Sequence, residues 1–177
     1  TEVDSIFFTR NEEAGYWSTI ILNNSTNANK LEFCRIEYGN KIDNFNGNMW
    51  YDMSGSISSL KSKGTIKNCF VGNNNINGVH IEAWASSNML VIKNSKIFNN
   101  NFGIYSTLVN NSNYDTLYCN NEFKFNSIGI RVSSNGHFNG VIANNLFQYN
   151  GTGISCNEGN FIIYNNDISN NSFGITL

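Results

Sequence analysis

An asparagine placed three residues ahead of a Gly-Ile pair recurs along this chain of 177 residues. It stands in NNNFGIYS, which begins at Asn99, and close variants are FNSIGIRV, YNGTGISC and NNSFGITL. A fixed period of about two dozen residues indicates a solenoid in which each repeat is one coil. Successive glycines of the pattern are 25, 26, 24 and 21 residues apart, at Gly78, Gly103, Gly129, Gly153 and Gly174.

The apolar runs between the polar positions are short and alternate in character, which predicts strands and not helices. After each glycine, the first and third residues of the strand face inward and the second faces outward. Asn and Gly suit the intervening corners because both tolerate left-handed backbone angles at low cost. The pattern therefore predicts coils with three faces. Seven coils are expected from the inward residues Ile20, Ile57, Val79, Ile104, Ile130, Ile154 and Ile175.

A second polar column, five residues ahead of the repeated asparagine, has the parity of the inward side chains. Its amides can stack along the axis, each donating to the next, at about 1 kcal/mol net apiece. The sequence thus predicts an all-β solenoid with an internal Asn/Cys/Ser ladder. The ladder positions are Cys34, Cys69, Ser95, Asn121, Asn145 and Asn166.

From about Trp17 to its end, the chain resembles the right-handed parallel β-helix family, the pectate-lyase-like superfold. The stretches YWSTIIL and LEFCRIEYG are similar to early coils of secreted members, in which a Trp precedes the first strand and a small Cys occupies the ladder. Eight leucines are too few for a leucine-rich repeat, and a left-handed β-helix needs a stricter hexapeptide pattern. We expect one domain, residues 1–177, with an insertion at 39–56. Because solenoids need polar caps and none is recognisable in the sequence, we expect further chain at both ends.

Composition narrows the class of partner. Only 14% of the residues are charged and the net charge is −2, so there is no basic footprint for nucleic acid. No apolar run approaches the roughly 20 residues of a membrane span. The chain has 36 asparagines and no proline, and their regular spacing favours packing over a low-complexity tract. The resemblance to secreted β-helix proteins implies a segment of an extracellular or cell-surface protein.

The four cysteines are interpreted as free thiols that act as small hydrophobes. There is no C-x-x-C spacing and no nearby histidine to suggest a zinc motif. Cys34 and Cys69 would stack in one interior column, where neighbours on parallel strands have poor geometry for a disulfide. Cys156 would share a column with inward apolar residues, and Cys119 would point outward.

The longest insertion, YGNKIDNFNGNMWYDMSGS, carries oxygen ligands and aromatic side chains. Calcium is a weak alternative there, because Phe45 breaks the EF-hand register and only two carboxylates are present, so we expect no cofactor. Trp50 and Tyr51 would either stack on sugar rings or fold down over the coil edge with Met53. The residues that suggested calcium are Asp43, Asn44, Asn46, Asn48 and Asp52.

The outward column of the strand after the glycine is the candidate site. His80, Tyr105 and Arg131 are consecutive in it, so they would project side by side across about 10 Å. Glu82 lies two residues beyond His80, Trp84 follows in the next turn, and the long insertion should reach the same face. A polar outer face that only keeps the rod soluble is the alternative interpretation. The full column is Ile21, Ser58, His80, Tyr105, Arg131, Ser155 and Thr176.

In the family that the chain resembles, the substrate lies on this strand face, and lyases and uronate epimerases there abstract a proton beside a carboxyl group. The resemblance implies that Arg131 would neutralise the carboxylate and that His80 or Tyr105 would be the base or acid. The carboxylate cluster that the family uses for calcium is absent. Our first hypothesis is a non-catalytic glycan-binding or scaffold module. A lyase or epimerase on acidic polysaccharide and a structural spacer without ligand are the alternatives. The expected substrate-binding residues are Glu82, Trp84, Trp50 and Tyr51.

Overall fold

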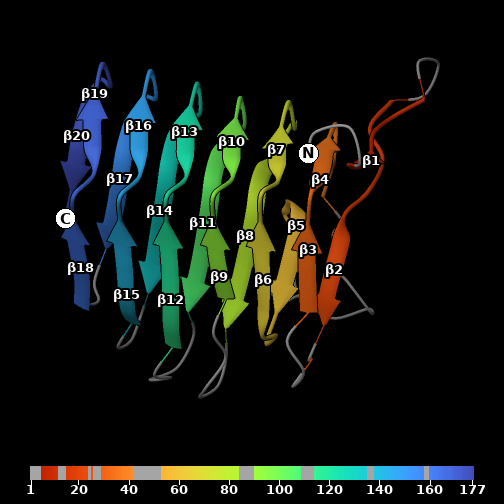
Figure 1. Ribbon diagram of the computed structural model, residues 1–177, viewed down its shortest axis with the longest axis horizontal. Helices are drawn as coiled ribbons and strands as arrows, with labels where there is room; N and C mark the ends of the chain where they lie inside the picture. The colour runs from red at the N-terminus through yellow and green to blue at the C-terminus, as the bar shows by residue number, and fades with distance from the viewer. Residues whose placement is uncertain are drawn as a thin grey trace.

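The computed structural model describes residues 5–11, 15–23, 25, 29–41, 53–83, 90–108, 114–134, 138–157 and 160–177. In this part of the chain all regular secondary structure is β-strand, and twenty strands form three parallel sheets. Figure 1 shows the coils side by side along the long axis, from the N-terminal end in red and orange to the C-terminal end in blue. Successive strands enter the three sheets in turn, so the predicted parallel β-helix is confirmed.

The three sheets are numbered here in the order in which each coil visits them. Sheet 1 contains β2 (Ile20–Asn23), β5 (Gly55–Leu60), β8 (Asn77–Ala83), β11 (Phe102–Leu108), β14 (Ile128–Ser134), β17 (Thr152–Asn157) and β20 (Phe173–Thr176). Sheet 2 contains β3 (Asn29–Glu32), β6 (Gly64–Lys67), β9 (Leu90–Lys93), β12 (Tyr114–Cys119), β15 (Phe138–Ala143) and β18 (Asn160–Tyr164). Sheet 3 contains β1 (Ile6–Phe8), β4 (Cys34–Glu37), β7 (Phe70–Gly72), β10 (Lys96–Phe98), β13 (Glu122–Lys124), β16 (Leu146–Gln148) and β19 (Asp167–Ser169). The seven strands of sheet 1 correspond to the seven predicted coils.

The core is a set of axial columns in which each inward side chain packs on its equivalent in the next coil. The inward residues of sheet 1, such as Ile104 and Ile130, are fully buried and directly paired in register. In sheet 3, the rings of Phe123 and Phe147 stack with centroids 4.7 Å apart and planes 4° apart. Tyr118 of sheet 2 is also fully buried, and its hydroxyl lies 3.0 Å from that of Ser106. Burial of these columns is the main stabilising contribution to the rod.

The corners on either side of sheet 3 each contain one residue in the left-handed region. Between sheets 2 and 3 its φ lies between 52° and 56°, at Phe33, Asn68, Asn94, Asn120, Asn144 and Asn165. Between sheets 3 and 1 its φ lies between 52° and 59°, at Tyr38, Asn73, Asn99, Phe125, Tyr149 and Asn170. Asparagine is the commonest residue at both corners, as expected from its tolerance of this backbone conformation.

The residue after each left-handed corner residue forms an internal ladder. In the predicted ladder, Asn121 Nδ2 donates to Asn145 Oδ1 at 3.1 Å, and Asn145 Nδ2 donates to Asn166 Oδ1 at 3.0 Å. Ser95 continues it by accepting from the backbone N–H of Cys69 at 3.2 Å. The predicted ladder, which we call the first ladder, is therefore confirmed. The sequence interpretation had not separated the two roles of asparagine, which fall on adjacent residues.

A second ladder runs along the corner between sheets 3 and 1, and it explains the Asn-x-x-Gly-Ile repeat. Each amide of this ladder donates to the next at 2.8 to 3.0 Å. In the insertion-bearing coil, the backbone N–H of Gly39 donates to Asn74 Oδ1 at 2.8 Å. Its members are Asn74, Asn100, Asn126, Asn150 and Asn171.

The four thiols are free and lie where the spacing predicts. Cys34 and Cys69 are buried in the first ladder, and Cys156 is buried in register with Val132. Burial raises the pKa of Cys69 to about 11 and that of Cys156 to about 12, so both thiols stay neutral at ordinary pH. A membrane-spanning helix must be long and apolar, and the described residues contain no such helix.

Candidate functional site

The predicted outward column of sheet 1 is formed in the expected register. Tyr105 pairs directly with His80 on one side and with Arg131 on the other. The rings of His80 and Tyr105 stack with centroids 5.3 Å apart and an interplanar angle of 15°. The structure therefore brings together the three side chains that the sequence singled out.

His80 is buried although it lies on the outer face of the sheet, with 4% of its surface exposed. Its Nδ1 accepts a hydrogen bond from the backbone N–H of Ser54 at 3.3 Å, and its Nε2 lies 3.3 Å from Thr107 Oγ1. Because Nδ1 accepts a hydrogen bond, the ring proton lies on Nε2, and this tautomer can donate to Thr107. Both nitrogens are thus engaged within the protein, which favours a positioning role for the imidazole over proton exchange with a ligand.

The last residues of the insertion lie beside His80, as predicted. The backbone N–H of Ser54 donates to this ring, and Met53 is buried. Glu82 is buried as well, with 6% of its surface exposed. Trp84, Trp50 and Tyr51 lie outside the described residues, as do the positions from 43 to 52 that suggested calcium. In the described part of the chain, no group of three or more acidic, histidine or cysteine side chains could hold a metal ion.

Tyr105 and Arg131 are half-buried, and Phe102 lies beside both of them. The rings of Phe102 and Tyr105 have centroids 5.3 Å apart, and the Arg131 guanidinium carbon lies 5.6 Å from the Phe102 ring centroid. This cation–aromatic cluster holds Arg131 near the surface of sheet 1. The catalytic roles of His80, Tyr105 and Arg131 stay predictions.

A groove that the sequence interpretation missed runs along the corner between sheets 2 and 3. We call it the corner groove. Its floor is the first ladder, and its two walls are the left-handed corner residues and the outward residues of sheet 3. Register places the latter in one axial column: Phe7, Arg35, Phe70, Lys96, Glu122, Leu146 and Asp167.

The N-terminal half of the corner groove is a hollow of about 790 Å³ with aromatic walls. Phe7 and Phe33 are 60% and 42% exposed, and Phe70 and Phe98 lie with centroids 6.3 Å apart. The Arg35 guanidinium carbon lies 4.2 Å from the centroid of the Phe70 ring. This half therefore combines exposed apolar rings with a cation whose planar face already rests on one of them.

The charge of Arg35 is balanced within the protein, because its Nε and Nη2 bind Glu37 at 2.6 and 2.9 Å. The floor below it is formed by Cys34 and Cys69, whose thiols are kept neutral by burial, which raises the pKa of each. Lys96 is exposed on the wall next to Phe70. The hollow is thus apolar at its floor and polar at its rim.

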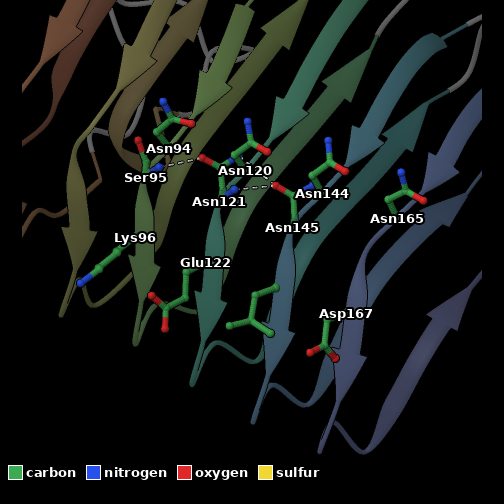
Figure 2. Close-up of a pocket in the computed structure, with 11 residues that line it drawn as sticks. Asn94, Ser95, Lys96, Asn120, Asn121, Glu122, Asn144, Asn145, Asn165 and Asp167 are labelled. Carbon is green, nitrogen blue, oxygen red and sulfur yellow. Dashed lines mark hydrogen bonds between the residues drawn. The ribbon is translucent and has the colours of Figure 1, made fainter.

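The C-terminal half of the corner groove is a hollow of about 630 Å³ with amide walls. Figure 2 shows Asn94, Asn120, Asn144 and Asn165 in a row along one side, and Lys96, Glu122 and Asp167 along the other. The ladder side chains lie between these two rows. The Glu122 carboxylate forms an ion pair with the ammonium of Lys124 at 2.6 Å.

The two halves form one groove because Asn94, Lys96 and Glu122 line both of them. A signal for this groove was present in the sequence. The residues immediately before and after each ladder position face outward, so the equivalent residues of successive coils could have been aligned as columns.

No model of a known protein family, no curated protein and no solved structure matches this chain.

Proposed function

We propose that this β-helix is a non-catalytic glycan-binding module of a secreted or cell-surface protein. The observation that carries the proposal is the N-terminal half of the corner groove, where exposed phenylalanine rings lie beside Arg35 and Lys96. An exposed apolar patch rimmed by polar residues is typical of a binding surface. Its volume of about 790 Å³ lies in the range of ligand sites.

The chemistry of this hollow suits a sugar ring. A pyranose has C–H groups on its faces and hydroxyls around its edge, so an aromatic ring covers the face while donors and acceptors meet the edge. Phe70 supplies such a ring, held in place by Arg35 on its surface. Lys96 and Asn94 supply polar groups on opposite walls. Within a space the size of one sugar, the hollow therefore offers an apolar ring for the face of the sugar and polar groups for its edge.

The lyase or epimerase alternative on sheet 1 stays a prediction. The hydrogen bonds to both nitrogens of His80 support the binding function over it, because a base or acid needs a free position toward its substrate. The direct check is turnover of acidic polysaccharides by the chain and by His80→Ala and Arg131→Ala variants. Loss of a measurable turnover in folded variants would establish the enzyme instead.

The binding proposal is tested with a glycan array followed by calorimetry on the best ligand. Phe70→Ala removes the central ring of the hollow, and affinity is expected to fall about tenfold or more. Phe173→Ala is the matched control, because Phe173 is 64% exposed in β20, on sheet 1 and not in the corner groove. Tyr105→Ala reports on the face predicted from the sequence.

The outcomes separate the hypotheses. Weakened binding in Phe70→Ala, with Phe173→Ala and Tyr105→Ala unchanged, supports the proposed site. Loss of binding only in Tyr105→Ala places the ligand on sheet 1 and refutes the corner groove. No binding to any glycan by the folded chain refutes the function and leaves the structural spacer.

A further inference from the structure

We infer that the corner groove binds a neutral, linear polysaccharide in extended form, parallel to the helix axis, with one sugar ring on each coil. This inference rests on the proposed glycan-binding function. It adds the class of glycan, its direction and its register on the protein. The observation behind it is the regular row of asparagine amides in the C-terminal half of the groove.

The row repeats with the coil. Asn94, Asn120, Asn144 and Asn165 are all exposed and have φ between 52° and 56°, so they present their side chains from equivalent backbone positions. Successive coils in a parallel sheet lie about 4.8 Å apart. This repeat is close to the length of one pyranose ring along an extended glycan. An extended polypeptide advances only about 3.3 Å per residue, so it would lose register with the row within a few coils.

The amides of this row are available to a ligand. In the part of the chain that the structure describes, none of the four has a hydrogen-bond partner for its side chain. The other corner differs, because Asn99 Nδ2 donates to Asn73 Oδ1 at 3.0 Å and Asn73 Nδ2 donates to Glu37 at 2.9 Å. Each available amide offers an acceptor oxygen and two donor hydrogens, which matches hydroxyls that both donate and accept.

The charges along the groove favour a neutral glycan. Two cations, Arg35 and Lys96, and two carboxylates, Glu122 and Asp167, line it, so their formal charges cancel. An acidic polymer that lay along the whole groove would meet Asp167 at its far end, where like charges repel. The carboxylates can instead accept hydrogen bonds from sugar hydroxyls.

The continuity of the groove sets the path of the chain. The walls of the two hollows share Asn94, Lys96 and Glu122, so a glycan that stacks on Phe70 leads directly to the asparagine row. The groove has contributions from all seven strands of sheet 3. Affinity should therefore increase with chain length up to about the number of coils.

The test is calorimetry with a length series, from disaccharide to octasaccharide, of the neutral glycan identified by the array. The variant Asn120→Gly/Asn144→Gly removes two amides and keeps a residue that tolerates left-handed angles. Asn170→Gly is the matched control, because Asn170 is exposed with φ 57° at the other corner. For the native chain, affinity should rise with each added sugar and stay constant between about 0.05 and about 0.5 M salt.

The double variant should bind long oligosaccharides about tenfold or more weakly, with trisaccharide affinity unchanged and the control like the native chain. Equal native affinity for trisaccharide and octasaccharide, or an equal loss in Asn170→Gly, overturns the inference. A preference for acidic glycans that disappears in salt also overturns it. If trisaccharide binding still depends on Phe70 in those cases, the proposed function stands without the inference. If no oligosaccharide binds, both fail.

Discussion

The ladder residue Asn126 should be among the least replaceable positions of the fold. It is 2% exposed, and its side chain forms four hydrogen bonds. Its Oδ1 accepts from the backbone N–H and from Nδ2 of Asn100, both at 3.0 Å. Its Nδ2 donates to the carbonyl oxygen of Ile97 at 3.1 Å and to Asn150 Oδ1 at 3.0 Å. Asn126→Ala removes all four bonds and leaves buried polar groups behind.

The expected cost follows from these bonds. At about 0.5–1.5 kcal/mol for each, the free energy of unfolding should fall by about 2–6 kcal/mol. A buried donor left without a partner costs its full desolvation, so the upper part of this range is expected. Asn101→Ala is the matched control, since Asn101 is an exposed neighbour with an ordinary backbone conformation, and it should change stability by less than about 0.5 kcal/mol.

Urea unfolding, followed by far-ultraviolet circular dichroism, measures both variants against the native chain. Solenoids can unfold in parts, so hydrogen exchange at the backbone amide of Asn100, which donates to Asn126 Oδ1, provides a local measure of the same loss. If Asn126→Ala costs less than about 1 kcal/mol and leaves exchange at this amide unchanged, the ladder does not stabilise the coils as argued.

Two further predictions concern packing between coils and the buried thiols. A Cβ at Gly103 would lie 2.5 Å from the carbonyl oxygen of Gly129, so Gly103→Ala should clearly lower the urea midpoint. A Cβ at Gly174 would lie 3.7 Å from Ile168, which is an ordinary contact, so Gly174→Ala should be tolerated. Equal midpoints for the two variants would show that the coils can separate without cost. Burial raises the pKa of Cys69 from 9.0 to about 11, so the folded state retains a proton that the unfolded state loses. This contribution to stability is complete below about pH 9 and is lost as the pH rises toward 11, so native stability should fall across that window and Cys69→Ala should fall less steeply. Parallel pH profiles of the two proteins would contradict this.

The repeat made much of the fold predictable, because each coil is a local unit that the next coil copies. The inward parity of Ile104 and Ile130 could be read from a few neighbouring residues, and in-register stacking then placed His80, Tyr105 and Arg131 in one column. The same parity identified the first ladder. Short-range alternation was sufficient for these features because parallel coils pair equivalent positions.

Burial of the candidate site could not be predicted in this way. His80 has the outward parity of a solvent-exposed residue, yet Ser54, 26 residues earlier in the chain, bonds to its ring. The direction of a side chain follows from the strand period, but its exposure depends on what else packs there. The sequence predicted that the insertion would reach this face, but the insertion interrupts the repeat, so the bond from Ser54 to the His80 ring depends on tertiary packing.

The sequence by itself determined the coil, the seven repeats and the columns of inward and outward side chains, since these depend on the spacing of residues within one coil. Only the tertiary structure decided that left-handed corners and ladder bonds fall on adjacent residues. It also decided that the hollows lie along sheet 3, where residues from seven coils form the walls of one groove. A groove is a property of neighbouring columns and their side-chain sizes, so it exists only once the coils are stacked.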